Sequence, residues 1–187
     1  MYEKTLSREV VFEGRILNVE VLEVELEDGR HSVREIVQHG VAVAIIAQLP
    51  DGHFVFIRQF RKAMERVCLE VVAGNCDPGE SAEFSAAREL QEETGYGAEA
   101  LELLGSIYPS VGYCTERIEV YFTPVGEQGA TAFDEDEHIE TVVFSEFEVD
   151  ELIRSNEISD AKTLAAWMLY KSKKAILRGK VFHKVTE

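Results

Sequence analysis

Apolar residues in the early part of the chain recur at intervals that favour β-strands. Strand-like runs cover residues 10–12, 16–26 and 32–37. Within the second run the alternation slips by one position between Val21 and Leu22, which predicts a β-bulge there or a strand that twists between two partners. Because so few strands are not stable alone, we expect residues 1–38 to pack on the main domain or on a second subunit.

A longer series of strands is expected from Gly40 onward. Residues 41–49 are almost continuously apolar, which is typical of a strand buried on both faces. Further strands are predicted at residues 54–60, 66–73, 101–107, 117–125 and 141–144. Residues 126–138 are polar and then strongly acidic, and they predict a loop.

Helical signals mark three stretches, residues 81–94, 146–154 and 160–178. For the first, Ser81 is a suitable N-cap and Gly95 suits a left-handed C-cap. The second opens with a capping box made by Ser145 and Glu148. Ser159 is the expected cap of the third helix.

The order of these elements indicates an α/β (α+β) fold. Strands precede the first helix, and more strands follow before the last two helices, which favours a mixed sheet inside an α/β/α sandwich. We therefore predict a main domain over residues 39–187. A small N-terminal antiparallel β subdomain is predicted over residues 1–38.

The helix predicted over residues 81–94 has two chemically different sides. One side carries Phe84, Ala87, Leu90 and Thr94, and the other carries Glu89, Glu92 and Glu93 among the small residues Ala82, Ser85 and Ala86. The three like charges repel one another by about 1 kcal/mol in total. A crowded set of hard oxygen ligands with open space around it suits Mg²⁺ or Mn²⁺, and Arg88 can hold a carboxylate in bidentate geometry beside it. The alternative is an acidic, solvated face on a very acidic protein.

Charge and cysteine content narrow the function classes. The net charge is −16, from 19 basic and 35 acidic residues, which argues against a general binder of nucleic acids or anionic membranes. The three cysteines, Cys68, Cys76 and Cys114, lack metal-site spacing and are interpreted as free thiols. Without a signal peptide or a long apolar run, a cytoplasmic protein is expected.

The acidic helix belongs to a longer pattern. The chain reads Gly, five residues, Glu, seven residues, then Arg-Glu-hydrophobic-x-Glu-Glu-x-Gly-hydrophobic. The matching positions are Gly74, Glu80, Arg88, Glu89, Leu90, Glu92, Glu93, Gly95 and Tyr96. This pattern resembles the Nudix box, and only Tyr96 departs from the aliphatic residue that is usual there.

The resemblance implies the Nudix fold and Mg²⁺-dependent hydrolysis of a pyrophosphate bond, with Mn²⁺ as a possible substitute. It assigns metal ligation to Glu89, Glu92, Glu93 and the backbone carbonyl of Ala73. Glu80 and Arg88 are expected to support these ligands without holding the metal themselves.

Motifs outside the box resemble the branch of ADP-ribose pyrophosphatases and nucleoside diphosphate sugar hydrolases. They are the segments 59–61, 70–74, 108–112, 134–140 and 158–163. Val72 and Val111 stand where that branch has proline, which puts the backbone around the sugar and phosphates in question. In this branch the N-terminal strands are commonly shared across a homodimer and help to form the site that binds the base. The resemblance therefore implies a role in dimerisation and substrate binding for residues 1–38, and a dimer is expected.

Three residues upstream of the box are candidates for substrate binding. Arg58 and Arg61 are expected to contact the diphosphate, although a surface salt bridge is an equal alternative for Arg58. Glu70 is a candidate for binding sugar hydroxyls, with a merely exposed strand glutamate as the alternative.

The acidic loop is expected to supply the general base. Glu137 and Glu140 are the first candidates and Glu135 is a third, while the alternative is that the loop is simply solvated. The resulting hypothesis is a hydrolase that splits a nucleoside diphosphate sugar into a nucleoside monophosphate and a sugar phosphate. The alternatives are a Nudix hydrolase of another nucleoside diphosphate derivative and a non-catalytic sensor.

Overall fold

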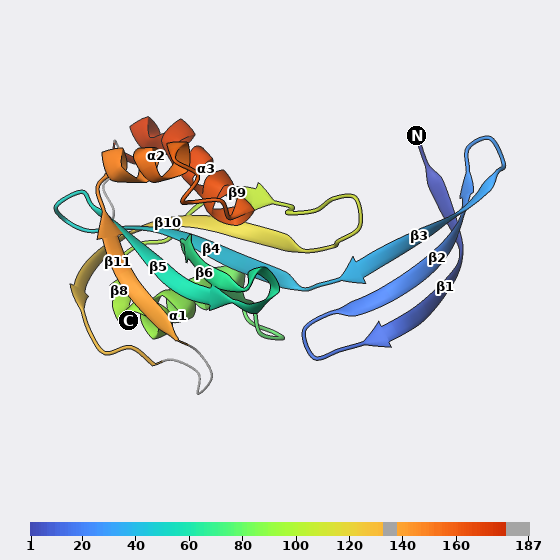
Figure 1. Ribbon diagram of the computed structural model, residues 1–187, viewed down its shortest axis with the longest axis horizontal. Coiled ribbons are helices and arrows are strands. Elements are labelled where there is room, and N and C mark those ends of the chain that lie inside the picture. Colours follow the sequence, from blue (N-terminus) through green and yellow to red (C-terminus); the bar gives the residue numbers. More distant parts are fainter. Residues whose placement is uncertain (133–137, 179–187) are drawn as a thin grey trace. The chain divides into compact units, whose positions relative to one another are not determined.

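The computed structural model describes residues 1–132 and 138–178 (Figure 1). The chain divides into two compact units. One unit combines Met1–Val41 with Tyr108–Arg117, and the other holds the rest of the chain. Among the described residues, none of the helices is both long and apolar enough to span a membrane.

The first unit is a three-stranded antiparallel sheet in the order β1-β2-β3. Its strands are β1 (Glu3–Glu13), β2 (Asn18–Leu26) and β3 (His31–Gln38). The backbone of the Tyr108–Arg117 segment joins β3, because the Val37 N–H donates to the Tyr113 carbonyl at 2.7 Å and the Thr115 N–H donates to the Val37 carbonyl at 3.0 Å. The predicted domain limits, 1–38 and 39–187, stay a prediction.

The bulge predicted at Val21 and Leu22 was wrong. Strand β2 pairs without interruption with β3, and the register shifts lie in the neighbouring β1, between Thr5 and Ser7 and again between Val10 and Phe12. The alternation slipped because a charged residue, Glu20, takes a buried position in β2. Its carboxylate accepts hydrogen bonds from Arg8 Nη1 at 3.4 Å and from Gln38 Nε2 at 2.9 Å.

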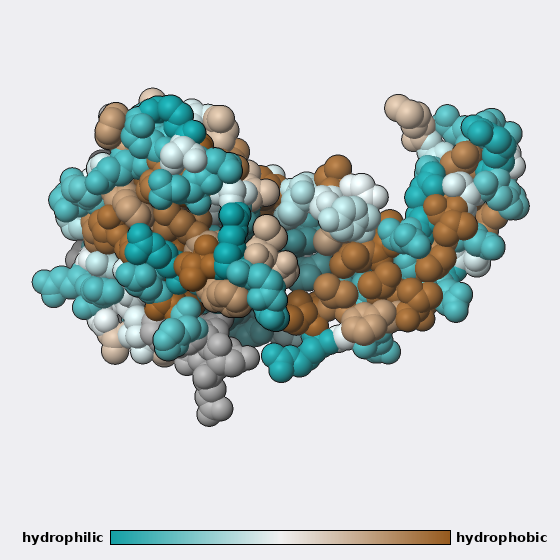
Figure 2. All heavy atoms as spheres, in the orientation of Figure 1, coloured by the Kyte–Doolittle hydropathy of each residue, from teal (hydrophilic) through white to brown (hydrophobic). Residues whose placement is uncertain are grey.

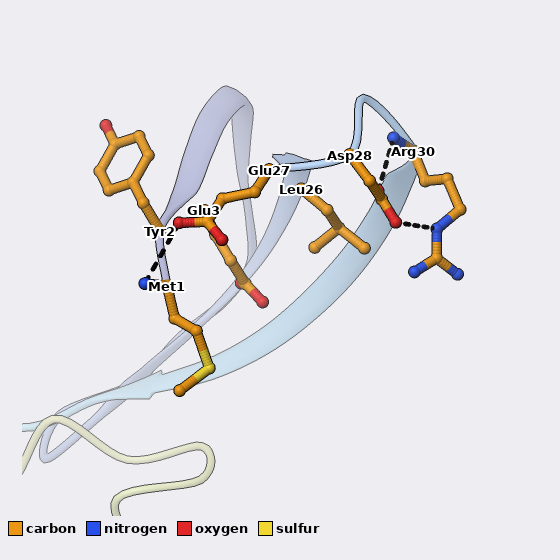
Figure 3. Close-up of a pocket in the computed structure, with 7 residues that line it drawn as sticks. All are labelled: Met1, Tyr2, Glu3, Leu26, Glu27, Asp28 and Arg30. Carbon is orange, nitrogen blue, oxygen red and sulfur yellow. Dashed lines mark hydrogen bonds and ion pairs between the residues drawn. The ribbon is translucent and has the colours of Figure 1, made fainter.

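The tip of this sheet carries an open depression of about 500 Å³ (Figure 3). Two ion pairs lie in it. The amino group of Met1 pairs with Glu27 at 3.1 Å, and Arg30 Nε donates to Asp28 at 2.7 Å beside the left-handed turn at Gly29. Both pairs are exposed, so they contribute little to stability.

The second unit is built on a mixed eight-stranded sheet whose main path runs β11-β5-β4-β10-β8. The strands are β4 (Val41–Gln48), β5 (Phe54–Arg61), β6 (Arg66–Glu70), β7 (Val72–Asn75), β8 (Tyr96–Ala98), β9 (Glu102–Ile107), β10 (Arg117–Gln128) and β11 (Ile139–Phe144). Successive residues of β4 pack alternately into two apolar cores. Helix α1 (Ala82–Thr94) contributes to one core, and α2 (Glu146–Arg154) and α3 (Ala161–Arg178) contribute to the other (Figure 1). The predicted α/β/α sandwich is therefore confirmed, and burial on both faces explains the continuous apolar run of β4.

The local helix signals were accurate with one exception. The Ser81 hydroxyl accepts a hydrogen bond from Phe84 N, Gly95 has a φ of 76°, and the capping box of α2 is complete. The expected cap of α3 was wrong, because Asp160 rather than Ser159 accepts from the Thr163 N–H, at 2.9 Å. The Ser159 hydroxyl instead accepts from Arg66 Nη2 at 2.8 Å.

The strand predicted over residues 66–73 is two strands. β6 pairs with β5, β7 pairs with β4, and Val71 lies between them. The Val71 N–H leaves the strand ladder and donates to the buried hydroxyl of Thr163 in α3, at 3.1 Å. The chain therefore changes its strand partner immediately before the box.

Candidate active site

Helix α1 packs its acidic side against β7 because of a glycine. A side chain at Gly74 would overlap the carboxylate of Glu89, so only glycine leaves room for this carboxylate beside the β7 backbone. Ser85, Ala86 and Glu93 are buried, whereas Phe84 is 59 % exposed. The acidic side of the helix is therefore partly buried against the sheet, and the alternative of a fully solvated acidic face was wrong.

Arg88 gathers the carboxylates of the box. Its Nη1 lies 2.9 Å from Glu92 and 3.0 Å from Glu89, and its Nη2 lies 3.4 Å from Glu80. The same Nη2 donates to the backbone carbonyl of Asn75 at 3.1 Å, which ties the helix to the end of β7. Burial alone lowers the pKa of Arg88, but the three carboxylates outweigh it, so the net pKa is raised and the guanidinium stays charged.

Glu80 supports this arrangement from the loop before α1. Its carboxylate accepts a hydrogen bond from the Ser85 hydroxyl at 2.8 Å as well as from Arg88. Glu80 is therefore held at the first turn of the helix. It lies outside the row formed by Glu89, Glu92 and Glu93 and is linked to that row through Arg88.

The donor set of the box consists of hard oxygen ligands, which suit a divalent cation. Carboxylate and carbonyl oxygens are the ligands that Mg²⁺ and Mn²⁺ prefer, and Gly74 brings Glu89 against the backbone that carries the Ala73 carbonyl. In the part of the chain that the structure describes, three or more acidic, histidine or cysteine side chains do not converge as a ready ligand set, and Arg88 pairs with Glu89 and Glu92. The residue types, and the space at Gly74 that the Glu89 carboxylate occupies, fit a divalent cation.

Arg61 and Glu70 form a second, partly buried centre. Arg61 Nε and Nη2 each donate to the Glu70 carboxylate at 2.8 Å, and Lys162 Nζ donates to it from α3. Glu70 is 2 % exposed, so its alternative interpretation as an exposed strand glutamate was wrong. Burial raises the pKa of Glu70, but the hydrogen bonds and charges of Arg61 and Lys162 outweigh burial and lower it. Its carboxylate is thus engaged inside the protein, and its predicted contact with sugar hydroxyls stays a prediction.

Arg58 and Glu140 contact each other at the other edge of this region. They face one another across β5 and β11, and their side chains form an exposed ion pair at 3.3 Å. This contact matches the surface-salt-bridge alternative for Arg58. The candidates Glu135 and Glu137 lie outside the described residues.

The segment 158–163, which resembles a motif of the branch, holds three residues for which no individual role was predicted, namely Asp160, Lys162 and Thr163. Asp160 Oδ2 accepts hydrogen bonds from Lys162 Nζ at 3.0 Å and from the Thr163 hydroxyl at 2.6 Å. The Asp-x-x-Thr spacing indicates a helix cap, but no local signal indicates that the same residues reach Glu70 and Val71.

The chain is similar to known proteins in both sequence and structure. Residues 38–168 match the family model described as NUDIX domain, and residues 3–37 match that of the nucleoside diphosphate sugar hydrolase N-terminal domain. The chain is 38 % identical to an ADP-ribose pyrophosphatase of Bacillus subtilis, over 93 % of this chain and 95 % of the relative. It is also 38 % identical to a methanol dehydrogenase activator of Bacillus methanolicus, over 88 % of this chain and 90 % of the relative. A crystal structure of an ADP compounds hydrolase superposes with a TM-score of 0.84 at 26 % identity, covering 97 % of this chain and 98 % of the other.

Proposed function

Since the chain belongs to the Nudix hydrolase family, we propose that this pyrophosphohydrolase cleaves nucleoside diphosphate sugars, with ADP-ribose as the first candidate. The products are a nucleoside monophosphate and a sugar phosphate. The proposal rests mainly on one observation. Arg88 forms ion pairs with a cluster of carboxylates, and one of them, that of Glu89, packs against Gly74.

The proposed division of roles follows from the positions of the side chains. Glu89, Glu92, Glu93 and the Ala73 carbonyl would hold Mg²⁺, which when bound neutralises diphosphate oxygens and activates water. Arg88 keeps the carboxylates of Glu89 and Glu92 oriented, and its own charge offsets their mutual repulsion.

Arg61 is the proposed contact to the diphosphate. Its Nε and Nη2 donate hydrogen bonds to Glu70, while the Arg61 side chain remains 37 % exposed. The hydrogen bonds that Arg61 donates to Glu70 raise the pKa of Arg61 despite its partial burial, and the negative charges of Glu70 and Glu93 add to the increase, so the guanidinium stays charged. A guanidinium held in one plane is well suited to phosphate oxygens.

Hydrolysis needs a water molecule that loses a proton as its oxygen attacks phosphorus. The new P–O bond forms while the bond to the bridging oxygen breaks, and this oxygen leaves with the second phosphate. We assign the proton to a carboxylate of the segment after β10, with Glu137 and Glu140 as the candidates. Because Glu140 pairs with Arg58 at the surface, serving as the base would require it to leave that ion pair.

The substrate class is supported by the N-terminal unit. Residues 3–37 match a nucleoside diphosphate sugar hydrolase domain, the relative from Bacillus subtilis is named ADP-ribose pyrophosphatase, and the superposed crystal structure is that of an ADP compounds hydrolase. Several apolar residues of this unit are exposed, among them Leu6, Val10, Val11, Phe12 and Val33. The space-filling view shows apolar surface over these strands (Figure 2). We propose that a second copy of the chain covers it in a homodimer.

The test is a hydrolysis assay over a panel of diphosphates with and without Mg²⁺. The panel contains ADP-ribose, other nucleoside diphosphate sugars, a dinucleoside polyphosphate, a dinucleotide coenzyme and a nucleoside triphosphate, and the products are identified by chromatography. We expect AMP and ribose 5-phosphate from ADP-ribose, only in the presence of the metal. Preferred cleavage of a panel member that is not a sugar would replace the proposed substrate class. Binding without cleavage of any member would indicate a sensor.

A further inference from the structure

The start of helix α3 is bonded to the corner where β6 ends and β7 begins. Lys162 Nζ donates to both the Glu70 carboxylate and, at 3.0 Å, the Asp160 carboxylate. One residue further along, the Thr163 hydroxyl accepts from the Val71 N–H at 3.1 Å and donates to Asp160 at 2.6 Å. Two adjacent side chains of α3 therefore hold two adjacent residues of the strand corner.

Burial makes these contacts energetically significant. Glu70 is 2 % exposed and the Lys162 side chain is 16 % exposed, so both charges are largely removed from water. A buried charge is strongly destabilising unless an opposite charge and hydrogen bonds compensate it. Two cations, Arg61 and Lys162, here balance the two carboxylates of Glu70 and Asp160. Lys162 thus helps to keep Glu70 ionised, and the ionised carboxylate accepts hydrogen bonds from Nε and Nη2 of Arg61.

The same corner leads directly into the box. Val71 is followed by Val72 and by Ala73, the proposed carbonyl ligand, and then by Gly74, against which Glu89 packs. A shift of this corner would move the Ala73 carbonyl and the guanidinium of Arg61 together. Displacements of about 1 Å in groups that bind a substrate can cost about 100-fold in rate.

We propose that Lys162 is a positioning residue for the hydrolysis reaction. Through Glu70 it orients Arg61 toward the diphosphate, and with Asp160 and Thr163 it holds the corner before the Ala73 carbonyl. The identity of the reaction rests on the function proposed above, and the role of Lys162 adds a residue from outside the box.

The chain offers a matched control in the same helix. Lys171 also bridges two carboxylates, Glu146 at 2.6 Å and Asp150 at 2.8 Å, but it does so between α3 and α2. Replacing Lys162 or Lys171 by methionine removes one ammonium group from two ion pairs in either case. We therefore compare Lys162→Met with Lys171→Met for both thermal stability and steady-state kinetics.

For Lys162→Met we expect KM for the cleaved diphosphate to rise about tenfold, because the contact that orients Arg61 through Glu70 is lost. We expect kcat to fall by less than about threefold, because Thr163 and Asp160 still hold the corner before the Ala73 carbonyl. Lys162→Arg is expected to restore most of the loss. Lys171→Met should lower the melting temperature by a similar amount and leave KM unchanged. Equal KM values for wild type and Lys162→Met would overturn the proposal, as would an equal rise of KM in Lys171→Met.

A double-mutant cycle with Arg61→Ala separates action through Arg61 from direct contact with the substrate. If Lys162 acts through Arg61, adding Lys162→Met to Arg61→Ala raises KM no further. Fully additive effects would mean that Lys162 contacts the substrate itself, and the positioning role would be rejected.

A readout that needs no turnover separates this proposal from the proposed function. In ¹H–¹⁵N spectra of the full chain, the Nε–H of Arg61 should give a signal protected by its hydrogen bond to Glu70, assigned by its loss in Arg61→Ala. In Lys162→Met this signal should broaden or shift, whereas it should persist in Lys171→Met. An unchanged Arg61 signal in Lys162→Met would overturn the positioning role, whatever substrate the panel assay identifies.

Discussion

Glu93 combines a carboxylate with nearly complete burial, at 3 % exposure. Its neighbours along α1 include Glu89 and Glu92, so its charge adds to the repulsion within the helix. Glu93→Gln should lower kcat by about 100-fold or more, since one proposed metal ligand loses its charge. The melting temperature should stay the same or rise slightly. Steady-state kinetics with Mg²⁺ and a thermal scan check this, and near-normal activity would remove Glu93 from the ligand set.

Gly74 leads to a second prediction at the same scale. A methyl group at this position overlaps the end of the Glu89 side chain, which is flexible and can move away. Gly74→Ala should therefore leave the protein folded but displace Glu89, and activity should fall by about tenfold or more. Gly97→Ala is the control, because its added carbon makes only an ordinary 3.6 Å contact to Gln91 Oε1. Full activity in Gly74→Ala would show that the Glu89 position is unimportant.

The placement of the box glutamates on one helix could be predicted because the whole pattern lies in one short segment. Glu89, Glu92 and Glu93 share a side of one helix, and local spacing suffices to place them together. The partners of Glu70 could not be predicted in this way. Lys162 reaches it from 92 positions further along the chain, and nothing local to either residue indicates that contact.

At the level of the elements, the helices and most of their caps were predictable, and strand boundaries were less so. Helix caps depend on three or four adjacent residues, which is why the capping box at Ser145 and Glu148 was accurate. The division of residues 66–73 into β6 and β7 depends on pairing with two different strands and on the Thr163 hydroxyl. An apolar run alone does not reveal a change of strand partner.

The joint between α2 and α3 should make stability depend on acid pH. Burial raises the pKa values of Glu146 and Asp150. The hydrogen bonds from Lys171 and Lys174 to Glu146, and from Lys171 and Trp167 to Asp150, outweigh burial, so both pKa values are lowered. Each carboxylate therefore contributes stability that is present above its ordinary value, 4.5 for Glu146 and 3.8 for Asp150, and lost as the pH falls through the lowered folded value.

Lys171→Met should weaken this dependence. The variant is expected to be less stable than wild type near neutral pH, and the difference in melting temperature should shrink as the pH falls from about 5 to about 3. Thermal scans across that range check the trend. A constant difference at all pH values would mean that Lys171 stabilises the joint by packing alone.

For the whole molecule, the exposed apolar residues of the N-terminal sheet predict a dimer. Light scattering should give a mass near twice the 21.0 kDa of one chain. Val10→Asp places a charge on a residue that is 53 % exposed in the single chain, and it should shift the population toward monomers. Met168→Lys is the control, since Met168 is 68 % exposed on α3 of the other unit. A monomeric wild-type mass at micromolar concentration would remove the dimer.

The hydrogen bond from the Val71 N–H to Thr163 makes this backbone amide a probe of the detachment of α3 from the sheet. Amides inside a strand ladder exchange with deuterium only when the strands separate, whereas the Val71 amide is protected by the side chain of a helix. Its deuterium uptake should therefore follow the detachment of the start of α3 from the sheet. Faster deuterium uptake at Val71 than at its neighbours in β7 would reveal partial unfolding in which the sheet stays intact while the start of α3 detaches from it.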